Sequence, residues 1–182
     1  MSPPTFTLST ADFSPDGAYR YALHRSWRGL FDAVCAPRVC LFVMLNPSTA
    51  DARVLDPTVR RCVAYAAAWG YDTLVVGNLF ALRSTDPSVL EHHADPVGPD
   101  NDAWLERLAH CADRIVAGWG NHGALHGRGA HVVQALSRVR EVHALHVTRE
   151  GEPGHPLYLP KLVEPFVYRA RAVDAVTAGA AS

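Results

Sequence analysis

LFVMLNPSTAD, residues 41–51, contains the plainest structural signal of the chain: an uninterrupted apolar run passes directly into a polar loop. The same change recurs in LVVGNLFALR, residues 74–83. A third apolar run, VHALHV at 142–147, leads through a glycine-rich turn into HPLYLP at 155–160. Apolar runs without alternation are typical of parallel strands that are covered on both faces. Ligands of open α/β sheets bind beyond the carboxyl ends of the strands, so these three loops predict a site.

Helical patterns alternate with the strands. Asp56 and Pro57 are suited to the N-cap and first position of a helix, and apolar residues then recur at helical spacing until Gly70. The same reasoning predicts a third short strand at residues 115–118 and further helices at 100–111 and 130–139. This order predicts an α/β fold, a three-layer α/β/α sandwich with a mainly parallel central sheet.

A chain of 182 residues that is 48% hydrophobic fits one globular domain with a core. Residues 1–18 are rich in Pro, Ser, Thr and Asp, and we expect them to form a loose N-terminal leader. Residues 19–177 are expected to form the single domain, and 178–182 a flexible tail. Within the domain, a weakly alternating segment at 19–27 predicts an edge strand, and residues 161–177 predict a helix or an edge element.

The formal net charge of -1 gives no general attraction for nucleic acid or an anionic membrane. Nucleic-acid contact would depend on a local basic patch, for which the arginines that flank the first two loops are candidates: Arg53, Arg60, Arg61 and Arg83. The four cysteines form no C-x-x-C pair, which favours free thiols in a reducing compartment. The chain lacks a secretory signal pattern and an apolar stretch of membrane-spanning length, so we expect a cytoplasmic protein without a membrane partner.

Two asparagines follow the first two strands. Pro47 fixes φ and removes a donor, so its loop is stiff and presents Asn46 rigidly. There Asn46 can position a water molecule or read a base edge, or it can satisfy its own turn backbone; the sequence leaves both open. The shielded amide of Asn78 must find partners, either in the neighbouring loop or in a planar amide-like edge such as a pyrimidine. Arg83 is placed to contact a phosphate or to form a surface salt bridge.

Histidines supply the other candidates. His155 can donate a proton or stabilise an anion near neutral pH, although a single histidine more often caps a loop. Residues 118–123 formally fit G-x-G-x-x-G, but they follow the third strand and lack the acidic partner, so we interpret them as a tight strand–helix turn. Glycines intervene between His122 and His126, and no acidic or cysteine ligand is near, so neither a metal nor another cofactor is expected.

The chain resembles, nearly end to end, an uncharacterised family known as domain of unknown function 1643. This resemblance rests on six motifs: Arg25-x-Trp27, residues 45–51, residues 56–58, residues 78–83, Trp119-Gly120 and residues 155–158. It implies no activity.

Residues 39–160 also resemble, more distantly, the uracil-DNA glycosylase superfamily. In that superfamily a Pro-containing loop follows the first strand, similar to residues 44–48, and an asparagine that reads the flipped base ends the second strand, similar to Asn78. A late His-Pro loop stabilises the departing base, similar to His155 and Pro156. The chain differs in having Asn46 where the efficient uracil enzymes have an acid, and in lacking a nearby stacking aromatic and the serine of the His-Pro loop.

The resemblance implies a uracil-DNA-glycosylase-like fold and a glycosylase-like hydrolase that acts on a nucleobase, nucleoside or nucleotide, free or in DNA. Asn46 would position the attacking water, His155 would stabilise the leaving base, and Asp51, with Asp56, would be the reserve acid or base. Six further residues would bind substrate: Pro47, Ser48, Asn78, Arg83, Pro156 and Tyr158. The alternatives are a non-catalytic protein that binds a nucleotide or modified base, and a different chemistry on a shared fold. Each requires Asn46, Asn78 and His155 to meet in one pocket.

Overall fold

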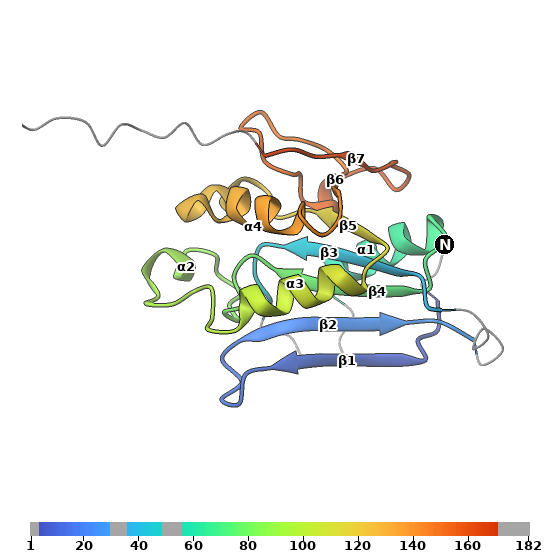
Figure 1. The fold of residues 1–182 in the computed structure, drawn as a ribbon, viewed down its shortest axis with the longest axis horizontal. Helices are drawn as coiled ribbons and strands as arrows, with labels where there is room; N and C mark the ends of the chain where they lie inside the picture. The colour runs from blue at the N-terminus through green and yellow to red at the C-terminus, as the bar shows by residue number, and fades with distance from the viewer. Residues whose placement is uncertain (1–3, 30–35, 49–55, 171–182) are drawn as a thin grey trace, which may run out of the picture.

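The computed structural model describes residues 4–29, 36–48 and 56–170, and it contains one sheet with helices on both faces (Figure 1). The strand order is β1-β2-β4-β3-β5-β6-β7. The strands are β1 Leu8–Phe13, β2 Arg20–Ser26, β3 Val39–Met44, β4 Thr73–Asn78, β5 Arg114–Ala117, β6 Val142–Ala144 and β7 Phe166–Val167. The helices are α1 Pro57–Ala68, α2 Val89–His92, α3 Asn101–Cys111 and α4 Arg128–Leu136, with 3₁₀ turns η2 Asn121–Gly127 and η3 Pro156–Tyr158.

The sheet is mixed, not mainly parallel as we expected. The strands β4, β3, β5 and β6 run parallel, while β1, β2 and β7 pair antiparallel with their neighbours. The α/β class and the two buried strands β3 and β4 are confirmed. Apolar patterning identifies a segment as a strand but does not encode its direction, which depends on the turn and on the neighbour.

Residues 8–13 belong to the sheet, although we expected them in a loose leader. They form β1, which pairs along its length with β2 and joins it through a turn at Gly17, where φ is 72°. Leu8 and Phe13 are exposed, so the strand shows no apolar alternation and is held by its backbone hydrogen bonds. The ordered structure therefore begins before residue 19. The ends of the chain, 1–3 and the tail at 178–182, lie outside the described residues.

The C-terminal segment contributes an edge strand. Phe166–Val167 form β7 against β6, which agrees with the edge alternative for residues 161–177; residues 171–177 lie outside the described part of the chain. The fourth strand is shorter than predicted, because β6 ends at Ala144 and Val147 instead forms an isolated bridge to Pro153. The described cysteines are free thiols: Cys40 and Cys62 are buried, and Cys111 is exposed. Among the described residues, no helix has the length and apolar character needed to cross a membrane.

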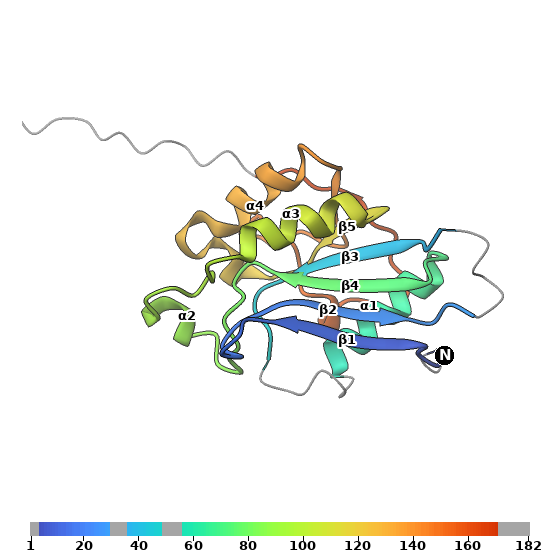
Figure 2. The same cartoon turned by 60° about the horizontal axis from the view of Figure 1, so that its bottom comes forward.

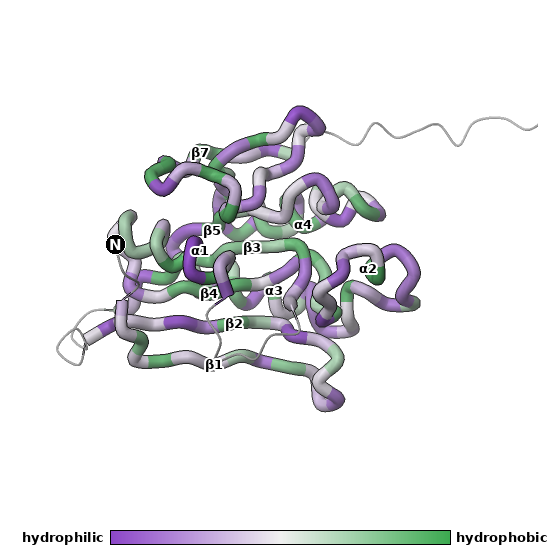
Figure 3. Tube along the Cα trace, turned by 180° about the vertical axis from the view of Figure 1, so that it is seen from behind, coloured by the Kyte–Doolittle hydropathy of each residue, from purple (hydrophilic) through white to green (hydrophobic). Residues whose placement is uncertain are grey.

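Both faces of the sheet are covered, which explains the unbroken apolar runs. Alternate residues of β3, such as Leu41, pack on one face with residues of α3 and α4, whereas Phe42 packs on the other face with residues of α1. Figure 2 shows α3 and α4 on one side of the sheet and α1 on the other. Seen from behind in Figure 3, β3 is drawn largely in green, as its burial on both faces requires.

Two side chains hold the carboxyl end of β4. Asn101, fully buried, donates from Nδ2 to the carbonyl oxygens of Asn78 and Leu79, each at 3.0 Å. Arg128 donates from Nε to the Leu79 oxygen at 2.9 Å and forms an ion pair with Asp102. These bonds satisfy carbonyls that face the interior at the end of the strand. They fix the backbone from which the Asn78 side chain projects.

Asn101→Ala should lower the free energy of unfolding by about 1–3 kcal/mol, because it leaves the buried Asn78 carbonyl without a partner. Urea unfolding measures this, with Asn121→Ala as the matched control because Asn121 is exposed. We expect the control to stay within about 0.5 kcal/mol of the parent. Equal losses for the two variants would contradict a structural role of the Asn101 amide.

Candidate functional site

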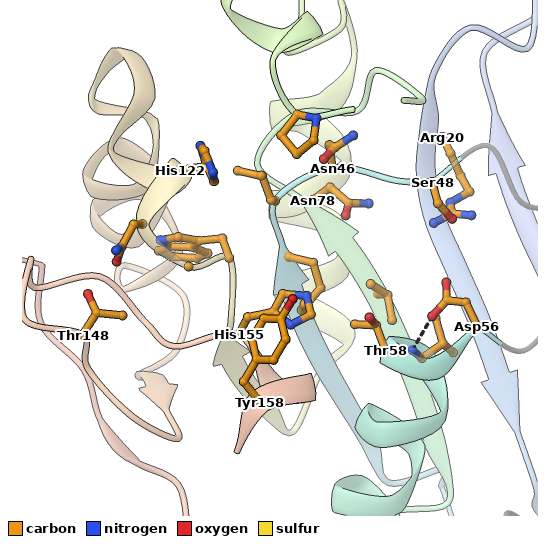
Figure 4. A pocket seen from close by; sticks show the side chains of 18 residues that line it. Arg20, Asn46, Ser48, Asp56, Thr58, Asn78, His122, Thr148, His155 and Tyr158 are labelled. Carbon is orange, nitrogen blue, oxygen red and sulfur yellow. Dashed lines mark hydrogen bonds between the residues drawn. The ribbon is translucent and has the colours of Figure 1, made fainter. Parts of the chain in front are cut away.

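A cavity of about 610 Å³ opens where the loops after β3, β4, β5 and β6 meet, and we call it the rim cavity (Figure 4). Five of the predicted site residues line it: Asn46, Ser48, Asn78, His155 and Tyr158. The three residues that had to meet, Asn46, Asn78 and His155, are therefore together at one edge of the sheet. This edge is the one predicted from the ends of the apolar runs.

Three other predicted residues that the structure describes, Pro47, Arg83 and Pro156, are not part of the lining. Pro47 is buried and its carbonyl accepts from Ser84. Arg83 donates to the Gly17 carbonyl at 2.8 Å and lies over the Phe13 ring, away from the cavity. Pro156 packs so closely on Gly118 that a Cβ there would lie 2.9 Å from its ring, so it positions the neighbouring His155. Asp51 lies outside the described residues, as does Arg53.

Asn46 anchors its own loop and faces the cavity. Its Nδ2 donates to the carbonyl of Ser84 at 2.8 Å and more weakly to that of Pro47 at 3.4 Å. Since the amide nitrogen is bound to backbone, the amide oxygen is the group that Asn46 offers to a ligand or a water molecule. The amide nitrogen therefore satisfies loop backbone, which is one of the two roles left open by the sequence, while binding of a ligand or a water molecule by the amide oxygen stays a prediction.

Asn78 presents a buried donor. Its side chain is 2% exposed, and Nδ2 has no hydrogen-bond partner within the described part of the chain. Its backbone carbonyl is already bound by Asn101. Buried amide groups in folded proteins are nearly always hydrogen-bonded, so this donor is available to a water molecule or to an acceptor of a ligand in the cavity.

His155 presents a donor of defined tautomer. Its Nδ1 accepts from the backbone N–H of Leu157 at 3.3 Å, so the proton of the neutral ring is on Nε2. Burial lowers the pKa of His155, against an opposing effect of Asp56, which favours the neutral ring near pH 7. Tyr158 lies beside it, with 5.4 Å between ring centroids, and is 82% exposed. Tyr158 thus offers the aromatic face that the first loop lacks.

The structure adds residues that sequence reasoning missed: Arg20, Thr58, Val59, Trp119, Asn121, His122 and Thr148. The stretch at 118–123 does turn tightly after β5, with φ of 73° at Gly120, but it also forms one wall of the cavity. Trp119 is held there by an Nε1 hydrogen bond to Glu152 at 2.7 Å. The available signal for Arg20 was a charged residue directly before the apolar residues 21–23 of β2.

Arg20 brings positive charge to the cavity. It is 5% exposed, and burial lowers its pKa to about 10, so it remains protonated at neutral pH. Asp56 acts on it from the same end of the cavity (Figure 4) and caps α1, accepting from the Val59 N–H at 2.7 Å. In the described part of the chain, no three His, Cys, Asp or Glu side chains are arranged to hold a metal.

Comparison with known proteins gives one family. No curated protein and no solved structure matches the chain significantly, so the resemblance to uracil-DNA glycosylases stays a prediction. The family model for proteins of unknown function DUF1643 matches residues 20–157, which is well over half of the 182-residue chain and includes every described residue of the rim cavity except Tyr158. The chain belongs to the DUF1643 family.

Proposed function

We propose that the rim cavity binds a nucleobase-containing ligand and hydrolyses its N-glycosidic bond. The observation that supports this is the meeting of Asn46, Asn78 and His155 around one cavity. Its volume of about 610 Å³ suits a small ligand of nucleoside or nucleotide size. On this proposal, the mixed sheet with helices on both faces would be a variant of the uracil-DNA glycosylase sandwich.

Asn78 would read the base. The unpaired Nδ2 is a donor, and a pyrimidine edge presents carbonyl oxygens that accept. Because the amide is 2% exposed, a base that fails to accept would leave this donor buried and unsatisfied. A base with a suitably placed acceptor would therefore bind more tightly than a base without one. Tyr158 would stack on the face of the same base.

Asn46 and His155 would act at the bond. The oxygen of a water molecule held by the Asn46 amide oxygen bonds to the sugar carbon, and the bond from that carbon to the base nitrogen breaks. The bonding electron pair leaves with the base, and the proton lost by the water ends on the base. The Nε2–H of His155 donates to the negative charge that grows on the base before that proton arrives.

A binding protein without turnover is the second candidate. Asp56 is the single carboxylate among the described lining residues, and its Oδ1 already accepts from the Val59 N–H. Asn46 likewise uses its amide nitrogen to fasten the loop. Without a free carboxylate to take the proton of water, the same cavity would hold its ligand unchanged. Tight binding of a base or nucleotide with no base release would decide for this candidate.

Asn78→Ala and His155→Ala should each reduce base release by about 10²–10³-fold, because each removes a donor aimed at the charge of the leaving base. Release is measured from labelled nucleosides, nucleotides and oligonucleotides. His131→Ala is the control, since His131 is an exposed histidine on α4 outside the cavity. Release that survives both cavity substitutions unchanged would remove these two roles.

Base release should persist at pH 6.5 and decline only under more acidic conditions. The pKa of His155 is lowered from an ordinary value of 6.5, so the folded protein takes up this proton at a lower pH than an exposed histidine does. Protonation of Nδ1 would break the bond from the Leu157 N–H and disturb the loop. The pH profile of kcat/KM measures this, since it reports groups of the free enzyme. An acid limb that is centred above 6.5, or that is unchanged in His155→Gln, would contradict the assignment.

A further inference from the structure

Arg20 is a buried cation without a counter-ion in the described part of the chain. It is 5% exposed, its Nε has no hydrogen-bond partner, and no described carboxylate forms an ion pair with it. A buried charge is costly unless it is paired and hydrogen-bonded. Its guanidinium lines the rim cavity, so the missing partner can come from a bound ligand.

The surrounding charges favour an anion. Among the described residues, the charged groups that act on Arg20 are two further guanidinium groups, Arg25 and Arg83, and one carboxylate, Asp56. One Asp56 oxygen is used by the Val59 N–H. Positive charge therefore exceeds negative charge around Arg20, and an anionic group that enters the cavity is attracted to it.

Ser48 and the first turn of α1 lie at the same end of the cavity. Ser48 and Arg20 both line the cavity, and the Ser48 Oγ is buried without a partner among the described residues (Figure 4). Thr58 and Val59, in the first turn of the 12-residue helix α1, also line the cavity. The N-terminal end of a helix favours anionic groups, but here Asp56 already accepts from the Val59 N–H, so binding of a phosphate would not depend on this helix end.

We propose that Arg20 and Ser48 form a phosphate subsite of the rim cavity, so that the ligand is a nucleoside monophosphate. The base part of this assignment rests on the proposed function, while the phosphate part rests on Arg20 and Ser48 alone. Arginine matches phosphate with paired N–H donors, and the Ser48 hydroxyl adds a third. A phosphate monoester fits this position better than a backbone diester. The polymer continues on both sides of a diester, whereas Arg20, which is 5% exposed as a residue, leaves little room around it.

Calorimetric titration of the full chain with nucleoside 5′-monophosphates, the matching nucleosides and inorganic phosphate tests the subsite. Since hydrogen bonds to charged groups are strong, the monophosphate should bind about 10–100-fold more tightly than its nucleoside. Arg20→Gln should abolish this preference while the affinity for the nucleoside stays unchanged. Arg20→Lys keeps the charge without the paired donors and should give an intermediate preference. Inorganic phosphate should compete with the monophosphate and not with the nucleoside.

Arg60→Gln is the matched control, because Arg60 is an exposed arginine on α1 outside the lining. It should keep the full preference for the monophosphate. If circular dichroism shows that Arg20→Gln does not fold, Arg20→Lys and Ser48→Ala decide the question, and each should weaken the monophosphate selectively. If the Arg20 and Arg60 variants lost the preference for the monophosphate equally, the subsite would be overturned. The subsite would also be overturned if the wild-type protein bound nucleosides or oligonucleotides more tightly than monophosphates, or if inorganic phosphate did not compete with the monophosphate.

The two proposals fail in different ways. Arg20-dependent binding of monophosphates without release of the base would refute the hydrolase and leave the phosphate subsite intact. Base release that is indifferent to the phosphate and to Arg20→Gln would refute the subsite and leave the hydrolase intact.

Discussion

The hydrogen bonds from Asn101 and Arg128 to the carbonyls at the end of β4 are the constraint on which the site depends. They come from the first residues of α3 and α4, so two helices are tied to the strand end that carries Asn78. Because the Asn78 carbonyl is satisfied from behind, its side-chain donor is left for the cavity. If these carbonyls were buried without partners, the loss of folding free energy would exceed the stabilisation that the hydrogen bonds provide.

The mixed sheet decides which side chains reach the rim cavity. The parallel strands bring the loops after β3, β4, β5 and β6 to one edge, which places amides and an imidazole there. Since β2 runs antiparallel to β4, the first residue of β2 lies at that edge, and Arg20 donates its backbone N–H to Ala81 just beyond Asn78. Had β2 been parallel, its other end would lie there. The direction of one strand thus supplies the only buried guanidinium among the described residues that line the cavity.

The sequence predicted the strands that are fully buried. It did not predict features that depend on the direction of a strand or on contacts between residues far apart in the chain. The apolar runs at 39–45 and 73–77 predicted β3 and β4, and the polar residues after them predicted the place of Asn46 and Asn78. β1 was missed because its side chains are largely exposed and backbone pairing holds it. The role of Arg20 could not be read locally, since it depends on a strand direction and on loops far along the chain. The resemblance to uracil-DNA glycosylases implied substrate-binding roles for Pro47, Arg83 and Pro156, but none of these residues lines the cavity.

For the proposed ligand, unsatisfied buried polar atoms are a closer constraint than the shape of the cavity. Three such atoms belong to described residues that line it: Arg20 Nε, Ser48 Oγ and Asn78 Nδ2. Each can donate, and the Nε2–H of His155 adds a further donor. A complementary ligand must therefore carry several acceptors and little competing donor capacity, with negative charge near Arg20. Carbonyl oxygens of a base together with phosphate oxygens meet this requirement, whereas a cationic or donor-rich ligand would leave these atoms unsatisfied. An apolar ligand would leave the same donors without acceptors, so we expect it to bind less tightly than a ligand that carries acceptors.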